Sequence, residues 1–251
     1  GLSGSLTQWA QPPSLRCMLR IAASLLILAS AGTAEDWWLE EELPFVDIRL
    51  GYGRLPIPDS YTVDIIDYPP APPGTFVEEN SVDPGWANAI SYSIVGGKLD
   101  PIGPLFGAEL VYAWASQDLT ARLLDGVPDP VPANPSSLHY RTFGGNILAG
   151  LGVALTRSVH LEALGVLGIG ALDLDFANAQ ATGQNDGEGW YWNAGVRGGI
   201  YYTWRRLVIG ASCEYTRLNY DAESNWAASN TATDGSVSGI GWRAEIGYHI
   251  P

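Results

Sequence analysis

The 251-residue sequence has little of several residue types that soluble enzymes use freely. It contains one lysine, one methionine, two cysteines and three histidines. Cys17 precedes the single methionine, Met18, so only Cys213 remains beyond it, and one thiol supports neither a disulfide framework nor a thiolate metal site. Basic residues are scarce beside acidic ones, and the net charge of −14 excludes nucleic acid and anionic membrane surfaces as electrostatic partners.

Long apolar runs are also scarce, and the mean hydropathy is only +0.03. One run, within residues 18–34, follows a basic Arg20 and ends in small residues up to Ala34, which is the pattern of a cleaved secretory signal peptide. The alternative, a transmembrane anchor, needs about 20 apolar residues. We therefore interpret residues 1–17 as an upstream extension, 18–34 as a signal peptide, 35–44 as a periplasmic leader and 45–251 as one domain.

Glycine, tyrosine and tryptophan are abundant, with 30, 12 and 10 copies. Residues 190–204 show how they are used, because apolar residues occupy the even positions, and Trp190, Trp192 and Trp204 stand at the ends of that face. Such a strand fits about 25 Å of hydrocarbon between two aromatic girdles. Arg197 lies on the other face, and since an arginine facing lipid at mid-depth costs about 2–4 kcal/mol, we expect it to face a protein interior.

Six other stretches alternate in the same way, and with residues 159–176 they make eight predicted strands. The connections between the eight are alternately long and short, with a two-residue turn at residues 205–206. The pattern predicts an all-β, eight-stranded antiparallel up-and-down transmembrane β-barrel, whereas a soluble sandwich gives no reason for strict alternation. One stretch, 159–176, is apolar on both faces, so a bulged strand and a helix are both alternatives to a regular strand there. The seven predicted strands besides 159–176 are 45–53, 86–95, 106–115, 141–155, 190–204, 207–215 and 240–250.

Strand number, loop alternation and signal peptide make residues 45–250 similar to the small outer-membrane barrels of the OmpA transmembrane-domain and OmpX type. The resemblance implies a Gram-negative outer membrane, contact with its lipids and lipopolysaccharide, and insertion by the outer-membrane assembly machinery. Such barrels typically end on an aromatic residue, but here Tyr248 is followed by three more residues. We expect a structural or surface-interaction protein with no catalysis, cofactor or nucleic-acid partner.

The predicted inward faces carry a set of charged side chains, and an eight-stranded barrel is just wide enough for side chains to fill it. We therefore predict an ion-paired network that plugs the interior, and a narrow polar channel is the alternative. His160 and His249, near the periplasmic strand ends, are expected to aid interior packing. The network comprises Asp47, Arg49, Glu109, Glu162, Arg197, Glu214, Arg243 and Glu245.

The predicted outside loops, 54–85 and 116–138 above all, offer surfaces for an extracellular ligand, and the YPPAPPG run at 68–74 suggests an extended segment that a partner binds. Carboxylates favour hard cations, but their spacing matches no EF-hand loop, so we expect a solvated acidic surface without a metal. These carboxylates are Asp59, Asp64, Asp67, Glu78, Glu79, Asp83, Asp173, Asp175, Asp186 and Glu188.

An enzymatic alternative rests on Ser137 and His139, which the strand order places at the outer rim of the barrel. Barrel enzymes that deacylate lipid A resemble a His-x-Ser pattern, whereas this chain has Ser-x-His. The reversed order favours a non-catalytic rim.

Overall fold

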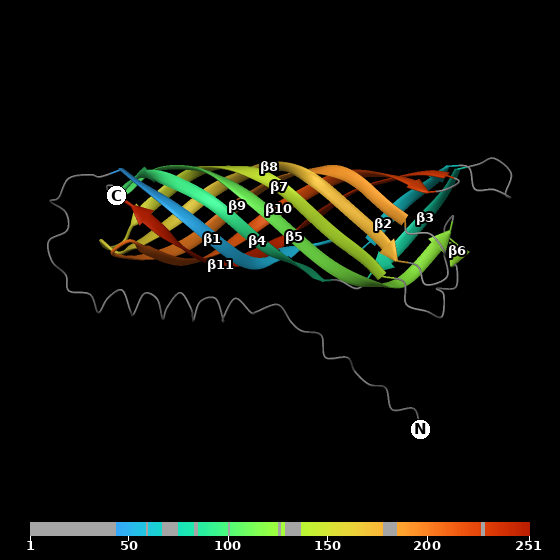
Figure 1. Ribbon diagram of the computed structural model, residues 1–251, viewed down its shortest axis with the longest axis horizontal. Coiled ribbons are helices and arrows are strands. Elements are labelled where there is room, and N and C mark those ends of the chain that lie inside the picture. Colours follow the sequence, from blue (N-terminus) through green and yellow to red (C-terminus); the bar gives the residue numbers. More distant parts are fainter. Residues whose placement is uncertain are drawn as a thin grey trace, which may run out of the picture.

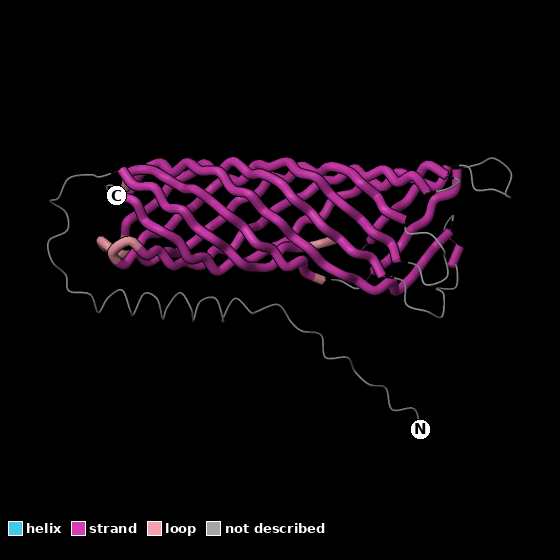
Figure 2. The backbone as a smooth tube through the Cα atoms, in the orientation of Figure 1, coloured by secondary structure: helices cyan, strands magenta, loops and turns pink. Residues whose placement is uncertain are grey.

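The computed structural model describes residues 44–58, 60–66, 75–82, 85–99, 101–124, 127–128, 137–177, 185–226 and 229–251. The predicted extension and signal peptide, and the leader up to residue 43, lie outside these ranges. The described residues are almost entirely strand (Figures 1 and 2). The strands are β1 (Pro44–Pro56), β2 (Ser60–Ile66), β3 (Thr75–Val82), β4 (Trp86–Lys98), β5 (Ile102–Leu124), β6 (Val127–Pro128), β7 (Ser137–Ala154), β8 (Val159–Ala177), β9 (Asn185–Trp204), β10 (Leu207–Trp226) and β11 (Ser229–Ile250).

Eight long strands close a barrel in the order β1, β4, β5, β7, β8, β9, β10 and β11, each antiparallel to the next (Figure 1). Closure is made by β1 and β11, in register from Val46 opposite Ile250 to Arg54 opposite Trp242. A closed ring pairs the backbone groups that an open sheet would leave at its edges. The predicted fold is therefore confirmed.

Burial alternates along each strand, as period-two geometry requires. In β1, for example, Phe45, Asp47 and Arg49 are buried while Leu50 and Tyr52 are exposed. The outer surface carries many large apolar side chains at 37–65% exposure, which a protein surrounded by water seldom tolerates and a barrel in hydrocarbon requires. Trp190, Trp192 and Trp204 belong to this surface. Among the described residues no helix is long and apolar enough to cross a bilayer.

The two ends of the barrel differ. The "turn end" holds the start of β1, the end of β11 and the short connections that follow β4, β7 and β9 (Figure 1). At the predicted turn after β9, Arg205 has a left-handed backbone with φ of 56°. The opposite "loop end" holds the connections that follow β1, β5, β8 and β10.

The strands at the loop end are longer than the sequence predicts. Residues 218–237, predicted as a loop, are paired from Leu218 opposite Val237 to Trp226 opposite Ser229. Likewise β5 continues to Leu124, although the prediction ends at residue 115. The exposed large apolar side chains form an apolar belt around the barrel, and these strand extensions lie beyond it. There neither face of a strand has to be hydrophobic. Small polar residues therefore pair through backbone hydrogen bonds without the alternation that marks a membrane strand.

The hairpin of β2 and β3 lies within residues 54–85, which the sequence predicts as a loop. β2 pairs with β11 at Asn230–Ala232, and β3 pairs with β5. Because β1 ends at Pro56 and β4 begins at Trp86, the hairpin continues the barrel wall where these two strands stop (Figure 1). The YPPAPPG segment at 68–74 lies outside the described residues.

β8 is regular, although its sequence is apolar on both faces. It pairs with β7 from Ser137 opposite Ala177 to Ala154 opposite His160, and with β9, without a register shift. His160 and Glu162 point inward, as predicted. Leucine and valine on its inner face pack in the apolar parts of the interior, so neither a bulge nor a helix is needed.

Candidate functional site in the barrel interior

Four buried charges form a central cluster near the middle of the barrel. Glu109 comes from β5, Arg197 from β9, Glu214 from β10 and Arg243 from β11, and each side chain is at most 3% exposed. The Arg197 guanidinium lies 2.6 Å from Glu109 and 2.7 Å from Glu214. Arg243 pairs with both carboxylates, at 3.0 Å from Glu214. Two arginines and two glutamates cancel in charge.

The central cluster crosses the bore. β5 and β10 stand on opposite sides of the eight-strand ring, and β9 and β11 flank β10. Glu109 therefore meets its two arginine partners across the interior, and Asn146 of β7 donates a further hydrogen bond of 2.8 Å to the same carboxylate. Multiple charge-assisted hydrogen bonds of this kind offset the cost of burying each ion.

A second, turn-end cluster is organised around Arg49. Its guanidinium lies 2.7 Å from Asp47 and 2.5 Å from Glu162, and it sits 3.9 Å above the centre of the Tyr201 ring. The Tyr201 hydroxyl donates a 3.0 Å hydrogen bond to Glu245, which also accepts one of 2.7 Å from Ser212. The cluster thus joins strands β1, β8, β9, β10 and β11.

The two histidines lie at the turn-end side of this cluster. His160 is 3.0 Å from Glu162, and His249 is 2.7 Å from Asp47. The Phe45 ring lies between them, with ring centres 5.9 Å and 5.6 Å away. His160 also stacks on Tyr201 at 5.4 Å. These contacts are interior packing combined with carboxylate pairing.

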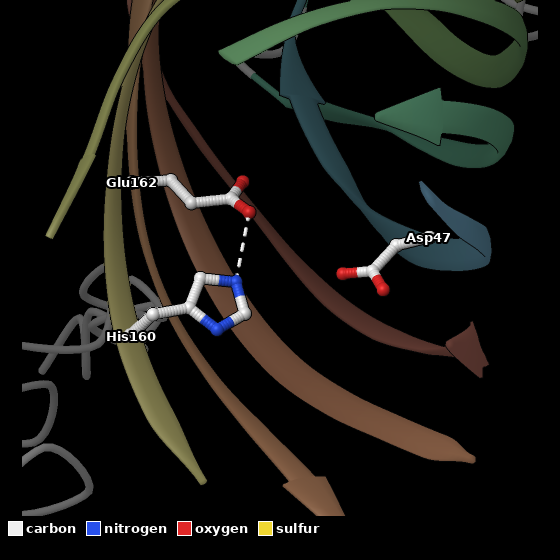
Figure 3. A group of neighbouring side chains, drawn as sticks. All are labelled: Asp47, His160 and Glu162. Carbon is white, nitrogen blue, oxygen red and sulfur yellow. Dashed lines mark hydrogen bonds and ion pairs between the residues drawn. The ribbon is translucent and has the colours of Figure 1, made fainter. Parts of the chain in front are cut away.

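Figure 3 shows Asp47 facing His160 and Glu162 across the interior. Their ligand atoms all lie within 4.8 Å of one another, a spacing compatible with a metal ion. However, Arg49 bonds both carboxylates directly. A guanidinium therefore already acts as the cation of this group, and a metal ion would have to displace it.

The structure buries all eight charged residues singled out from the sequence and divides them between two clusters. Asp47, Arg49, Glu162 and Glu245 belong to the turn-end cluster, and the other four form the central cluster. Sequence reasoning did not assign Tyr201 or Asn146 to the network. Parity was the available signal for Tyr201, because it shares the inward face of β9 with Arg197.

On the loop-end side of the central cluster the interior becomes apolar. Small residues such as Ala87, Ala89 and Ala113 occupy inward positions together with Leu138, Tyr140 and other buried side chains. Between this apolar part and the central cluster lies a cavity of about 30 Å³. The inward alternation indicates which residues line the interior, but side-chain volumes alone do not show where space remains.

Ser137 and His139 lie at the loop-end start of β7, and both are partly exposed. Leu138, between them, and Tyr140, which follows His139, are both buried. The side chains of Ser137 and His139 therefore face outward. Strand register places Ser116 of β5 opposite His139 on one side and Asp175 of β8 opposite it on the other. The direct neighbour of His139 is therefore Ser116 and not Ser137.

The acidic loop residues predicted to remain solvated are described only in part. Asp173 is half exposed and pairs with Arg141 at 3.3 Å on the outer face. Asp175 is partly buried there, while Glu188 is exposed. For Asp59 the backbone is not described, and for Asp64 the side chain is not described. The backbone is likewise not described for Asp67 and Asp83. The side chain is likewise not described for Glu78, Glu79 and Asp186.

The sequence matches no protein-family model and no curated protein. Among solved structures, the chain is similar to the outer membrane protein OprG from Pseudomonas aeruginosa, with 16% identity over 86% of this chain and 99% of that one and a TM-score of 0.45. It is similar to Ail, the attachment invasion locus protein of Yersinia pestis, solved with the heparin analogue sucrose octasulfate (13% identity, 82% and 99% covered, TM-score 0.38). Neisserial surface protein A matches at 11% identity (83% and 99% covered, TM-score 0.32).

These three neighbours are small eight-stranded outer-membrane β-barrels. This chain is a closed eight-stranded barrel as well. With identities of 16% or less and TM-scores of 0.45 or less, these likenesses carry no conclusion about this chain. Its fold rests on its own strand pairing, and its function has to be argued from its own interior and surface.

Proposed function

We propose that the chain is an outer-membrane protein of a Gram-negative-type bacterium, exported by the predicted signal peptide, whose filled barrel is a rigid scaffold for surface interactions. The observation that carries this proposal is the central cluster, in which Glu109, Arg197, Glu214 and Arg243 bond across the bore. The apolar belt with its tryptophans supports a membrane location. The turn end then faces the periplasm and the loop end faces outward.

A filled interior is incompatible with an open channel. Two clusters at different depths obstruct the bore, and moving an ion past them would require separating buried ion pairs that are costly to break. In planar bilayers the purified barrel is therefore expected to give little or no steady current. Changing the four central residues to alanine leaves the turn-end cluster and the apolar loop-end interior in place, so this variant is expected to remain closed as well. Steady ohmic conductance of the unaltered protein would favour the channel alternative.

The surface-interaction part of the proposal rests on the loop-end wall. Two features project beyond the apolar belt: the hairpin of β2 and β3, and the paired extensions of β5, β10 and β11. Together they form a rim that is available for contact with a partner. Cells that display the barrel are expected to adhere to cultured epithelial cells, and replacing residues 60–82 with a short glycine linker is expected to reduce adhesion. Surface display of both proteins must be equal. Adhesion that is unaltered by this replacement contradicts a role of the hairpin.

A second candidate, hydrolysis of an outer-leaflet lipid, is favoured by one observation. The register aligns Ser116, His139 and Asp175 on the outward face of three neighbouring strands, the residue types of a nucleophile, a base and its orienting acid. No hydrogen bond joins them among the described residues, so they would have to close up on substrate. The candidate predicts that His139→Ala and Ser116→Ala abolish deacylation of lipid A while Ser137→Ala does not. Identical lipid profiles with and without His139 exclude it.

A further inference from the structure

Positive charge gathers at the turn end of the barrel, although the chain as a whole carries a net charge of −14. The three short connections there, together with the last residue of β4, contain four basic residues and one acidic residue, Asp100. The four are Lys98, Arg157, Arg205 and Arg206, and each is exposed. The net charge that argues against an anionic membrane surface for the whole chain therefore does not describe this end.

The three connections lie side by side along one edge of the barrel. The amide of Ala154, at the end of β7, donates a 2.7 Å hydrogen bond to Pro101 in the connection after β4. The amide of Thr203, near the end of β9, donates one of 2.7 Å to Ser158 in the connection after β7. The basic side chains therefore project from one continuous edge.

Arg205 and Arg206 lie on the outside of this edge, next to the apolar belt. The Arg205 guanidinium lies 5.4 Å from the centre of the Trp204 ring, and Arg206 donates a 2.7 Å hydrogen bond to the Tyr248 hydroxyl. Trp204 and Tyr248 are 57% and 45% exposed and belong to the outer surface. The two guanidiniums thus stand where the apolar belt ends, which in a bilayer is the depth of the lipid headgroups.

The backbone at Arg205 indicates that its side chain is retained for a reason other than the turn. Its φ of 56° is left-handed, and a two-residue hairpin turn favours glycine or asparagine in that conformation. Strain that persists in a structure is more frequent at functional residues than elsewhere. A long cationic side chain at headgroup depth is suited to contact a phosphate group.

We propose that Arg205 and Arg206 bind the phosphate of a phospholipid with net negative charge, in the leaflet that surrounds the turn end. A guanidinium donates two parallel hydrogen bonds to phosphate oxygens, which makes arginine well suited to this contact. Lys98 and Arg157 on the same edge add a favourable field for a negative headgroup. This inference rests on the membrane location in the proposed function and not on adhesion.

A second anionic group is close in the sequence. Residues 35–43, which precede β1, contain five acidic residues. The lipid is the better match for Arg205 and Arg206, because both guanidiniums contact aromatic rings of the outer, lipid-facing surface.

The test uses the chain from Glu35 onward, folded in a neutral detergent with equal amounts of phosphatidylglycerol and phosphatidylcholine of the same acyl chains. Native mass spectrometry counts the lipids that the barrel retains. We expect phosphatidylglycerol to be retained preferentially. Arg205→Gln combined with Arg206→Gln is expected to reduce this preference about fivefold for each charge removed.

Two further double variants separate a phosphate contact from a structural role of the turn. Lysine at both positions 205 and 206 keeps the charge and is expected to keep most of the preference. Arg54→Gln combined with Arg217→Gln removes two exposed arginines of β1 and β10, away from the turn end, and is the matched control. Equal losses in the lysine and glutamine variants, or in the control and the glutamine variant, overturn the proposal.

The acidic segment is tested by changing Glu40, Glu41 and Glu42 to glutamine. We expect the lipid preference to be unaltered, and a preference that exists only after this change assigns the basic edge to the segment and overturns the proposal. Heat-modifiable gel mobility shows that each variant is folded. A folded barrel that retains both lipids equally overturns this inference alone, whereas mobility that boiling does not alter contradicts the membrane barrel of the proposed function as well.

Discussion

At the scale of single residues, the interior is governed by what arginine does when it is buried. Arg49, Arg197 and Arg243 are each at most 4% exposed, and each contacts two carboxylates. A buried ion pair contributes little net stability compared with a well-packed apolar core, but removing one partner strands the other. The clusters therefore define the arrangement of the strands that meet in them.

Replacing Arg197 with alanine is expected to destabilise the barrel by about 3–5 kcal/mol, because Glu109 and Glu214 would then share Arg243 alone. The folded band on a gel should convert to the unfolded band at lower temperature. Arg217→Ala, on an exposed position of β10, is the matched control. A melting profile that is unaltered by loss of Arg197 contradicts the network.

Glycine is needed at position 210, where the ring of Tyr201 covers the backbone. A Cβ at Gly210 would lie 2.1 Å from Cδ1 of that ring, which is held between Arg49 and His160. Gly210→Ala is expected to cost about 1–3 kcal/mol, as overpacking does. Urea unfolding in lipid vesicles measures this cost. Gly198→Ala, where the new Cβ has room, should be nearly neutral, and equal effects of the two changes would refute the account.

At the scale of elements, the turn between β9 and β10 is the tightest connection described. Arg205 has φ of 56°, a conformation that costs most residues about 1–2 kcal/mol and favours glycine in a two-residue hairpin turn. The Arg205 guanidinium lies 5.4 Å from the ring centre of Trp204, and Arg206 donates to the Tyr248 hydroxyl at 2.7 Å. The strained turn is thus anchored on aromatic residues of the outer surface.

A β-branched residue at this turn should be harmful. Arg205→Val is expected to lower the free energy of unfolding by about 1–2 kcal/mol, because valine tolerates a left-handed backbone poorly. Arg205→Gly, which also removes the guanidinium, separates the backbone effect from the loss of the contact to Trp204. Equal unfolding midpoints for the valine and glycine variants would show that the backbone conformation is not decisive.

The sequence predicts some of the strands and not others, and the reason is physical. Where a strand crosses the apolar belt with polar side chains on its inner face, as in residues 190–204, lipid on one face and the interior on the other impose a period of two that the sequence displays. β8, which is apolar on both faces, is the exception. Outside the belt that requirement ends, so β3 and the extensions of β10 and β11 were not predicted as strands. For the same reason parity identified the eight inward charges, while the pairing between them and the cavity depend on the relative heights of strands that sequence does not reveal.

At the scale of the whole molecule, closure makes the barrel a single cooperative unit. Every long strand has two neighbours, so none unfolds without breaking a complete ladder of hydrogen bonds.

The unboiled barrel in detergent is therefore expected to migrate differently from the boiled protein, since the closed ring resists detergent until it is heated. Semi-native gel electrophoresis across a temperature series is the measurement. The predicted signal peptide and the predicted leader should be absent from the protein compared. Mobility that boiling does not alter would argue against a closed membrane barrel.

The hairpin of β2 and β3 has a consequence for the order in which the chain assembles. β2 follows the first strand of the barrel, yet it pairs with β11, the last strand, at Asn230–Ala232. The entropy lost in closing so long a stretch of chain has to be offset before this contact is favourable. β2 therefore gains its second neighbour only after the final strand has been synthesised and placed, and the hairpin docks late. The hairpin part of the wall is therefore completed after the eight-stranded ring.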